Sequence, residues 1–149
     1  MAKFVFGLQN VLDIKEKIEA QARQDFANAA GLLEEQKRIL AGLYERKEQL
    51  IAEGQELVQG KLDFREIDEN RLAKEYIDRK IEDQIINVNK AEANVERARR
   101  KMSEAMAEKK TYERLRDKAF EEYLIEENRA ESKVVDELTS YTYGQKTKA

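Results

Sequence analysis

The densest group of side chains that could bind an anion is a basic cluster made of Arg97, Arg99, Arg100 and Lys101, with Lys109 and Lys110 following two helical turns later. Basic side chains along one helix can contact DNA phosphates. Against that interpretation, apolar residues continue at regular spacing through the cluster, and Glu96 stands four residues before Arg100, the favourable order for an ion pair within a helix. Such charge runs are typical of a solvated coiled-coil surface, which is what we expect here.

The residues most often used in catalysis are absent. The sequence contains no histidine and no cysteine, which removes the usual general base near neutral pH, disulfides, thiolate metal sites and thiol nucleophiles. None of the short motifs that hold nucleotide phosphates or zinc occurs in it. Aspartate and glutamate are plentiful, but charged residues belong on the outside of a heptad repeat. We therefore expect no catalytic, cofactor-binding or metal-binding residues and no enzymatic activity.

The elements that position these charges are predicted by apolar residues at alternating three- and four-residue spacing, which is the pattern of a coiled coil. The second half of the chain shows it most clearly, in two sets that each share one heptad position. The first set is Ile67, Ile81, Val88, Val95, Met102 and Tyr123, and the second is Ile77, Ala91, Ala98, Ala105, Tyr112 and Ala119. Such a narrow stripe leaves no side on which to build a pocket, so function is expected on surfaces and ends.

The first half of the chain carries a less regular stripe. Fourteen positions are spaced alternately by four and three residues from Phe4 and Leu8 to Leu50, and ten of them are apolar. A second stripe runs one residue further around the helix, through Leu12, Phe26, Leu33, Leu40 and Leu57. Two parallel stripes predict that the seam drifts or contains a stutter near Asp25. Gly31 and Gly42 lie inside this helix, where each costs about 1 kcal/mol relative to alanine.

A turn is predicted between the two halves. Gly54 and Gly60 bracket a stretch where the helical period lapses, and Gly60 suits the left-handed residue that ends a helix. Asp63 with Glu66 resembles a capping box, in which Asp63 accepts from the amide of residue 66. The expected fold is all-α: a long antiparallel two-helix coiled coil, or α-hairpin, whose second helix overhangs the first.

The domain prediction is a single hairpin over residues 1–149. Helix one covers about residues 4–58, the turn about 54–66, helix two about 67–140, and a frayed tail extends to 149 because the apolar stripe is lost there. A parallel homodimer of one bent helix is the competing arrangement, and composition does not exclude it.

The amino-acid composition limits the classes of protein to which the chain can belong. The chain has 149 residues, of which 40% are charged and 7% aromatic, with no proline. That is too polar for a wide globular core. The net charge of -3 gives no field that favours nucleic acid or an anionic membrane. Without an apolar segment suited to export or to membrane insertion, a cytosolic protein is expected.

A docking patch is predicted near the turn. Leu40 with Tyr44, and Tyr76 with Ile77, include residues that face away from the best-fitting stripe. Exposed apolar pairs at the tip of a hairpin favour partner binding. The alternative, burial of the same residues by a drifting seam, stays open.

Three features together resemble a known family. Residues 4–13 place an aromatic, a leucine and a Val-Leu pair ahead of a charged helix, and residues 127–138 contain Lys133, Asp136 and Glu137 as a Lys-x-x-Asp-Glu element. The third feature is a proline-free length near 150 residues. The chain resembles the flagellar FliJ protein family, a component of the flagellar type III export apparatus, over essentially its whole length. Ser132 departs from that family's pattern, which often has glutamine before the lysine.

The resemblance implies a stalk-like protein that is similar to the coiled coil of the rotary ATPase γ subunit. It implies three partners: the flagellar export ATPase hexamer, whose ring assembly and activity the protein promotes, the cytoplasmic domain of the export gate membrane protein, and export chaperones. It also implies a cytoplasmic location, peripherally associated with the membrane export apparatus. The candidate ATPase contacts, at the joined chain ends, are Phe4, Phe6, Leu8, Lys133, Asp136 and Glu137. The candidate gate contacts are Leu40, Tyr44, Tyr76 and Ile77.

A local argument supports the ATPase contacts. Asp136 and Glu137 are expected near a helix C-terminus, where the helix dipole disfavours acidic residues by a few tenths of a kcal/mol. Unfavourable placement of this kind suggests that an external partner uses these carboxylates.

Other classes of function remain as alternatives. A generic cytosolic coiled-coil scaffold or chaperone, prefoldin-like in outline, comes second, although no segment alternates with the period of a β-strand for long enough. A nucleic-acid-binding protein comes third, and we expect no nucleic acid as a partner. An enzyme comes last, because both a pocket and catalytic side chains are lacking.

Overall fold

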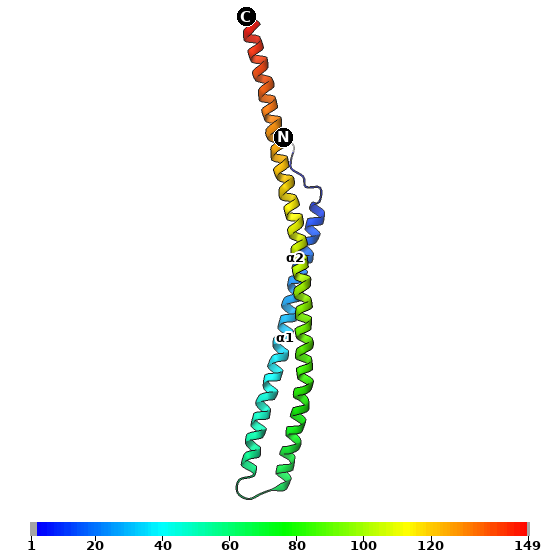
Figure 1. Cartoon of the computed structure of the whole chain (residues 1–149), viewed down its shortest axis with the longest axis vertical. Coiled ribbons are helices and arrows are strands. Elements are labelled where there is room, and N and C mark those ends of the chain that lie inside the picture. The colour runs from blue at the N-terminus through cyan, green and yellow to red at the C-terminus, as the bar shows by residue number, and fades with distance from the viewer. Residues whose placement is uncertain (1–2, 149) are drawn as a thin grey trace. The chain divides into compact units, whose positions relative to one another are not determined.

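Two long helices make up the structure. The computed structural model describes residues 3–148, with side chains described over residues 3–144. Helix α1 spans Gln9–Leu57 and helix α2 spans Phe64–Lys148, and no strand occurs among the described residues. The two helices pack as a helical hairpin (Figure 1). The expected fold class is therefore confirmed.

The chain divides into two compact units, and each helix contributes to both. The hairpin unit is Ala20–Ser103 and contains the turn. The terminal unit combines Met1–Glu19 with Glu104–Ala149. Within the hairpin unit, Gln36 contacts Gln84 and Leu50 contacts Asn70, so positions in α2 fall as positions in α1 rise. In the terminal unit Lys15 contacts Glu108 and Phe4 contacts Phe120, which gives the same antiparallel sense.

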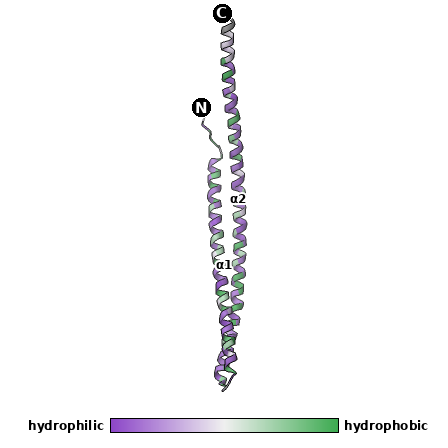
Figure 2. Cartoon of the chain, turned by 90° about the vertical axis from the view of Figure 1, so that its left-hand side faces the viewer, coloured by the Kyte–Doolittle hydropathy of each residue, from purple (hydrophilic) through white to green (hydrophobic). Residues whose placement is uncertain are grey.

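The seam of α2 follows the heptad predicted for it. Each of the twelve residues named for this seam is buried or half-buried, from Ile67 to Tyr123. The structure adds polar members to the same positions, namely Asn70, Lys74, Gln84 and Lys109. Hydrophobic residues recur along both helices between hydrophilic ones (Figure 2). A narrow apolar stripe is thus enough to join the helices, with charged residues covering the rest.

The seam of α1 is regular, so the predicted drift or stutter near Asp25 is wrong. Its buried and half-buried positions repeat every seven residues and are Leu12, Lys15, Glu19, Ala22, Phe26, Ala29, Leu33, Gln36, Leu40, Leu43, Lys47, Leu50, Gly54 and Leu57. Several members of the predicted stripe, including Leu8, Ile18 and Leu32, are exposed instead. The apolar count favoured these residues because Ile18, Leu32 and Ile39 are apolar but exposed. Each stands one residue before a seam position, and one of those seam positions is the polar Glu19.

The turn occupies residues 58–63 and uses the residues predicted for it, with one change. Gly60 has φ of 82°, the left-handed conformation that favours glycine. The carboxylate of Asp63 accepts from the backbone amide of Arg65 at 3.0 Å, not from that of residue 66. An N-cap side chain bonds the second or third amide of its helix, and α2 begins at Phe64, so Asp63 caps α2 by the shorter of the two routes.

Both outer helix boundaries differ from the expected ones. Helix α1 begins at Gln9 and not near residue 4, because Gly7 and Leu8 form a turn in which Gln9 donates to the carbonyl of Phe6 at 3.1 Å. Helix α2 continues to Lys148, so the tail predicted to fray after residue 140 is helical through the described residues. Without proline, no residue there blocks the helix, and the hydroxyl of Thr142 donates to the carbonyl of Leu138. Residue 149 lies outside the described residues.

The best-buried apolar cluster lies in the hairpin unit. Leu50, Ile77 and Ile81 are buried together, and Leu40, Leu43 and Ala73 pack against them. These aliphatic side chains join the two helices next to the turn. Each buried aliphatic side chain contributes about 1.5–3 kcal/mol, so the turn end of the hairpin is held by apolar burial.

Two buried amides lie in the same seam and are fully engaged. Asn70 donates to the carbonyl of Leu50 at 2.9 Å. Gln84 donates both to the carbonyl of Gln36 and to its side-chain oxygen, at 2.9 and 2.8 Å. Over the described residues no buried side-chain nitrogen or oxygen lacks a hydrogen-bond partner. These amides therefore avoid the desolvation cost of burial, and their hydrogen bonds cross from one helix to the other.

Gly54→Ala should destabilise the protein by about 1–2 kcal/mol, since a Cβ there would lie 2.6 Å from the side-chain oxygen of Asn70 and break a buried hydrogen bond. Gly42→Ala is the matched control, because a Cβ at that helical position meets nothing within 4 Å. It should stabilise by about 0.5–1 kcal/mol. Urea unfolding followed by circular dichroism measures both, and equal stabilisation by the two substitutions would contradict the role given to Asn70.

Candidate functional site

An aromatic cluster anchors the N-terminal segment to α2 in the terminal unit. The ring of Phe4 lies 5.1 Å from that of Phe120, edge to face, and 5.4 Å from that of Tyr123. Phe120 and Tyr123 are themselves stacked at 6.2 Å. Phe6 is half-buried, whereas Leu8 is exposed. Ring packing thus holds the non-helical residues ahead of α1 against α2, and Phe4 contacts its own chain.

Two ion pairs join the helices in the same terminal unit. Lys15 donates to Glu108 at 2.7 Å, and this hydrogen bond raises the pKa of Lys15 above its usual value. Glu19 is 6% exposed, with its carboxylate 3.4 Å from the ammonium of Lys109. A carboxylate this buried requires its partner, because removing one member of a buried pair leaves an uncompensated charge.

The predicted ATPase contacts fall into two separate places. Lys133, Asp136 and Glu137 all lie on α2 and are exposed. Along a helix, Lys133 stands about 15 Å beyond Tyr123, where the N-terminal segment packs. The structure therefore does not gather the six residues into one site at joined chain ends. Nor does the dipole argument hold, because α2 ends at Lys148 and the dipole acts only within the last turn.

The segment that carries Lys133, Asp136 and Glu137 is a single helix without a neighbouring helix. Every side chain from residue 128 to residue 143 is exposed. Figure 1 shows this part of α2 running past the N-terminal segment. We call residues 128–144 the C-terminal extension. It presents functional groups on all sides, which a helix inside a bundle does not do.

One face of the C-terminal extension is apolar. Val134, Val135 and Leu138 are 54%, 58% and 61% exposed, and their three- and four-residue spacing puts them on one side. Lys133 and Glu137, four residues apart, share the neighbouring side. Exposed apolar faces are a common feature of partner-binding surfaces. Sequence reasoning missed it, although Val134 and Leu138 continue a four-residue spacing that was available in the sequence.

The predicted gate contacts also divide into two kinds. Ile77 is buried and Leu40 packs against the same apolar cluster, so these two residues hold the hairpin together. For these two residues the structure shows the alternative that was left open, burial in the seam, because both occupy its heptad positions. Tyr44 and Tyr76 are 45% and 52% exposed. Tyr76 lies under the ammonium of Lys80, 5.5 Å from the ring centroid, so the tyrosines are the accessible members of the predicted patch.

Three arginines of the basic cluster of α2 bond to side chains of their own helix. Glu96 accepts from Arg99 at 2.6 Å and from Arg100 at 3.4 Å, and Arg97 donates to Asn94. The hydrogen bond from Arg99 is the main cause that lowers the pKa of Glu96 below its usual value. Any stability from this pairing is therefore present at neutral pH and is lost as the pH falls through that lowered pKa. The solvated-surface interpretation of these charges agrees with this geometry.

The described residues hold no group of three or more acidic side chains arranged to bind a metal ion. Within the same residues, neither helix contains a stretch apolar and long enough to cross a membrane.

In comparison with known families, the chain matches the family described as "Flagellar FliJ protein" over residues 4–148. No curated protein and no solved structure matches the chain. The matched range contains both helices and the C-terminal extension.

Phe4→Ala should free the N-terminal segment from α2, because it removes both ring contacts of Phe4. Hydrogen exchange of the amides at the start of α1, including those of Gln9 and Leu12, should become roughly fivefold faster, which corresponds to about 1 kcal/mol. Val5→Ala is the control, because Val5 is 80% exposed. Equal exchange rates in the two variants would show that the ring contacts do not anchor the segment.

Proposed function

The chain belongs to the flagellar FliJ family, whose members are non-enzymatic components of the flagellar export apparatus, and we propose that it is the stalk-like component of that apparatus. In this role it promotes assembly and activity of the export ATPase ring. It also links the ring to the cytoplasmic domain of the export gate membrane protein and to export chaperones. It works in the cytoplasm, peripherally associated with the membrane apparatus.

The observation that carries this proposal is the C-terminal extension of α2. Its side chains from residue 128 to residue 143 are all exposed, including Lys133, Asp136 and Glu137. A single helix with no neighbouring helix can enter a ring and contact several subunits at once. The charged residues match the element on which the family resemblance rests.

Two properties of the extension suit contact with a ring of identical subunits. The apolar face of Val134 and Leu138 supplies buried area when a subunit closes on it. Charged side chains surround this face: the extension carries three carboxylates and two basic side chains, and four more carboxylates lie just before it, between Glu121 and Glu127. Charged contacts that stay near solvent contribute little energy each, which favours exchange between subunit states over static binding.

The tyrosines of the hairpin unit are the proposed contacts for the export gate. Tyr44 and Tyr76 offer large rings with polar tips, the residue type most often enriched in binding hot spots. Leu40 and Ile77 act indirectly in this proposal, because they fix the helices that carry the two rings. Export chaperones are proposed to bind the remaining charged surface of the helices.

A second candidate function is a generic coiled-coil scaffold or chaperone. The exposed apolar residues Ile18, Leu32 and Ile39, which lie at seven-residue multiples along α1, favour helix-on-helix binding of some kind. The two functions differ in one measurable respect, since only the stalk should stimulate an ATPase.

Replacing Val134 and Leu138 by serine should weaken stimulation of the matching export ATPase, raising the half-maximal protein concentration about tenfold or more. The change removes the apolar contact and leaves the helix exposed as before. The matched control is Leu72→Ser with Ile86→Ser, at equally exposed positions of the hairpin unit. A separate variant, with the charges of Asp136 and Glu137 reversed, tests whether these carboxylates contribute to stimulation of the ATPase. If the protein neither binds nor stimulates the ATPase, only the scaffold function remains.

Tyr44→Ala with Tyr76→Ala should weaken binding to the cytoplasmic domain of the export gate, again by about tenfold, while stimulation of the ATPase stays unchanged. Isothermal titration calorimetry with the purified domain measures the affinity. Leu32→Ala is the control for loss of an exposed apolar side chain in the same unit. Undiminished gate binding by the double variant would remove the tyrosines from the proposed interface.

A further inference from the structure

The two helix seams contain polar residues that meet complementary groups on the opposite helix of the hairpin. We propose that these residues select the intrachain antiparallel hairpin and exclude the parallel homodimer that the same heptads would otherwise form. The polar residues are Lys15, Glu19, Gln36 and Lys47 on α1, and Asn70, Gln84 and Lys109 on α2; Gly54 on α1 acts with them because it leaves space for Asn70.

In the hairpin each of these residues meets a complementary group. Lys47 donates to Asp78 at 2.8 Å, and Glu19 lies 3.4 Å from Lys109. The hydrogen bond to Asp78 raises the pKa of Lys47 above its usual value. Gln36 and Gln84 bond directly to each other. Gly54 leaves space that the side chain of Asn70 fills. Each charged side chain thus has an oppositely charged partner, the two glutamine amides bond to each other, and the glycine leaves room for a buried polar side chain.

In a parallel dimer of two copies every seam residue meets its own counterpart. Lys15, Lys47 and Lys109 would each face a second lysine, and Glu19 would face a second glutamate. Like charges held together in a seam repel, and Glu19 is almost fully buried. Gly54 would face Gly54 and leave a void, while Asn70 would lose the carbonyl of Leu50. Polar residues at heptad core positions are known to set register and oligomeric state in this manner.

A slip of the hairpin by one heptad is disfavoured for the same reason. The slip would move Asn70 away from the space at Gly54 and Gln84 away from Gln36, so both amides would be buried without these partners. The apolar seam positions alone would tolerate the slip, because leucine, isoleucine and valine replace one another there. Selection of one register therefore depends on the polar residues.

Selection of the hairpin has a consequence for the C-terminal extension. In a parallel dimer the apolar face of Val134 and Leu138 would be covered by the second copy. In the monomer that face stays open for a different partner. The seven carboxylates between Glu121 and Leu138 also disfavour the parallel dimer, because the negatively charged segments of two copies would repel each other. This consequence rests on the proposed stalk function, whereas the selection of the hairpin does not.

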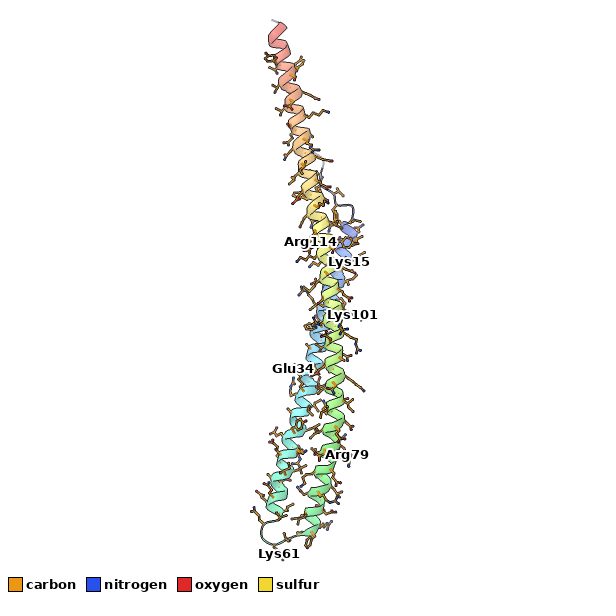
Figure 3. All side chains as sticks on the ribbon, in the orientation of Figure 1. Lys15, Glu34, Lys61, Arg79, Lys101 and Arg114 are labelled. Carbon is orange, nitrogen blue, oxygen red and sulfur yellow. The ribbon has the colours of Figure 1, made fainter. Side chains whose placement is uncertain are left out.

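An apolar-seam variant tests the proposal: Lys15→Leu, Glu19→Leu, Lys47→Leu and Lys109→Leu together. Light scattering after size-exclusion chromatography should find the natural protein monomeric at micromolar to hundred-micromolar concentration, and the variant partly or wholly dimeric with a higher Tm. A control with Lys17→Leu, Glu34→Leu, Lys61→Leu and Lys101→Leu changes the same residue types at exposed positions and should stay monomeric. Figure 3 labels three of these control residues, with Lys61 in the turn. A dimeric natural protein, a monomeric variant or a dimeric control would each overturn the proposal.

Exchanging the charges of Glu19 and Lys109 distinguishes the hairpin from the parallel dimer without adding apolar groups. Glu19→Lys or Lys109→Glu alone should lower the Tm by roughly 5 °C, and the two together should recover most of that loss. In a parallel dimer the two positions, separated by 90 residues, lie about 135 Å apart and cannot couple. Additive effects of the two substitutions would therefore overturn the pairing.

A crosslink gives a third readout, since the chain has no natural cysteine. Gln36→Cys with Gln84→Cys should oxidise within one chain, because the two side chains touch in the hairpin. On a non-reducing gel the product should run as a monomer. A disulfide-linked dimer at low protein concentration would contradict the selected arrangement.

Discussion

The whole structure depends on one constraint: each helix has one narrow seam to bury, and in this fold the other helix of the same chain buries it. With 40% charged residues, the apolar side chains outside the seam stay exposed and form no second layer among the described residues. The seam therefore has to supply both cohesion and specificity. Leu50, Ile77 and Ile81 supply cohesion near the turn. The amides of Asn70 and Gln84 supply specificity, because a hydrogen bond across the seam forms in only one register.

The same narrowness decides where function can lie. A two-helix seam encloses no cavity, so binding must use the outer faces of the helices or a helix without a neighbour. The chain offers both, as the exposed tyrosines of the hairpin unit and as the C-terminal extension. Seam residues near the turn, such as Leu40 and Ile77, are needed for packing and so cannot also face a partner. In the proposed function, partner binding and helix packing therefore use different residues at neighbouring heptad positions.

Much of the fold could be predicted because its determinants are local. The heptad of α2, the left-handed glycine at residue 60 and the cap at Asp63 each depend on residues close together in the sequence. The candidate site was less predictable. Phe4 was assigned to a partner, but it packs on Phe120 and Tyr123, a contact between residues more than a hundred positions apart. No local sequence pattern predicts such a contact, because the sequence around an aromatic residue near a chain end does not show whether the ring packs on its own chain or binds another.

The sequence by itself determined that the chain is two helices with a turn between them, because periodicity, glycine and capping residues act over a few positions. The family was also determined there, by short matches at the two ends. Only the tertiary structure decided which stripe of α1 is buried. Lys15, Glu19 and Gln36 look like surface residues until Glu108, Lys109 and Gln84 stand opposite them. A polar side chain can lie in a core only when its partner is present, and the partner is chosen by the pairing of distant segments.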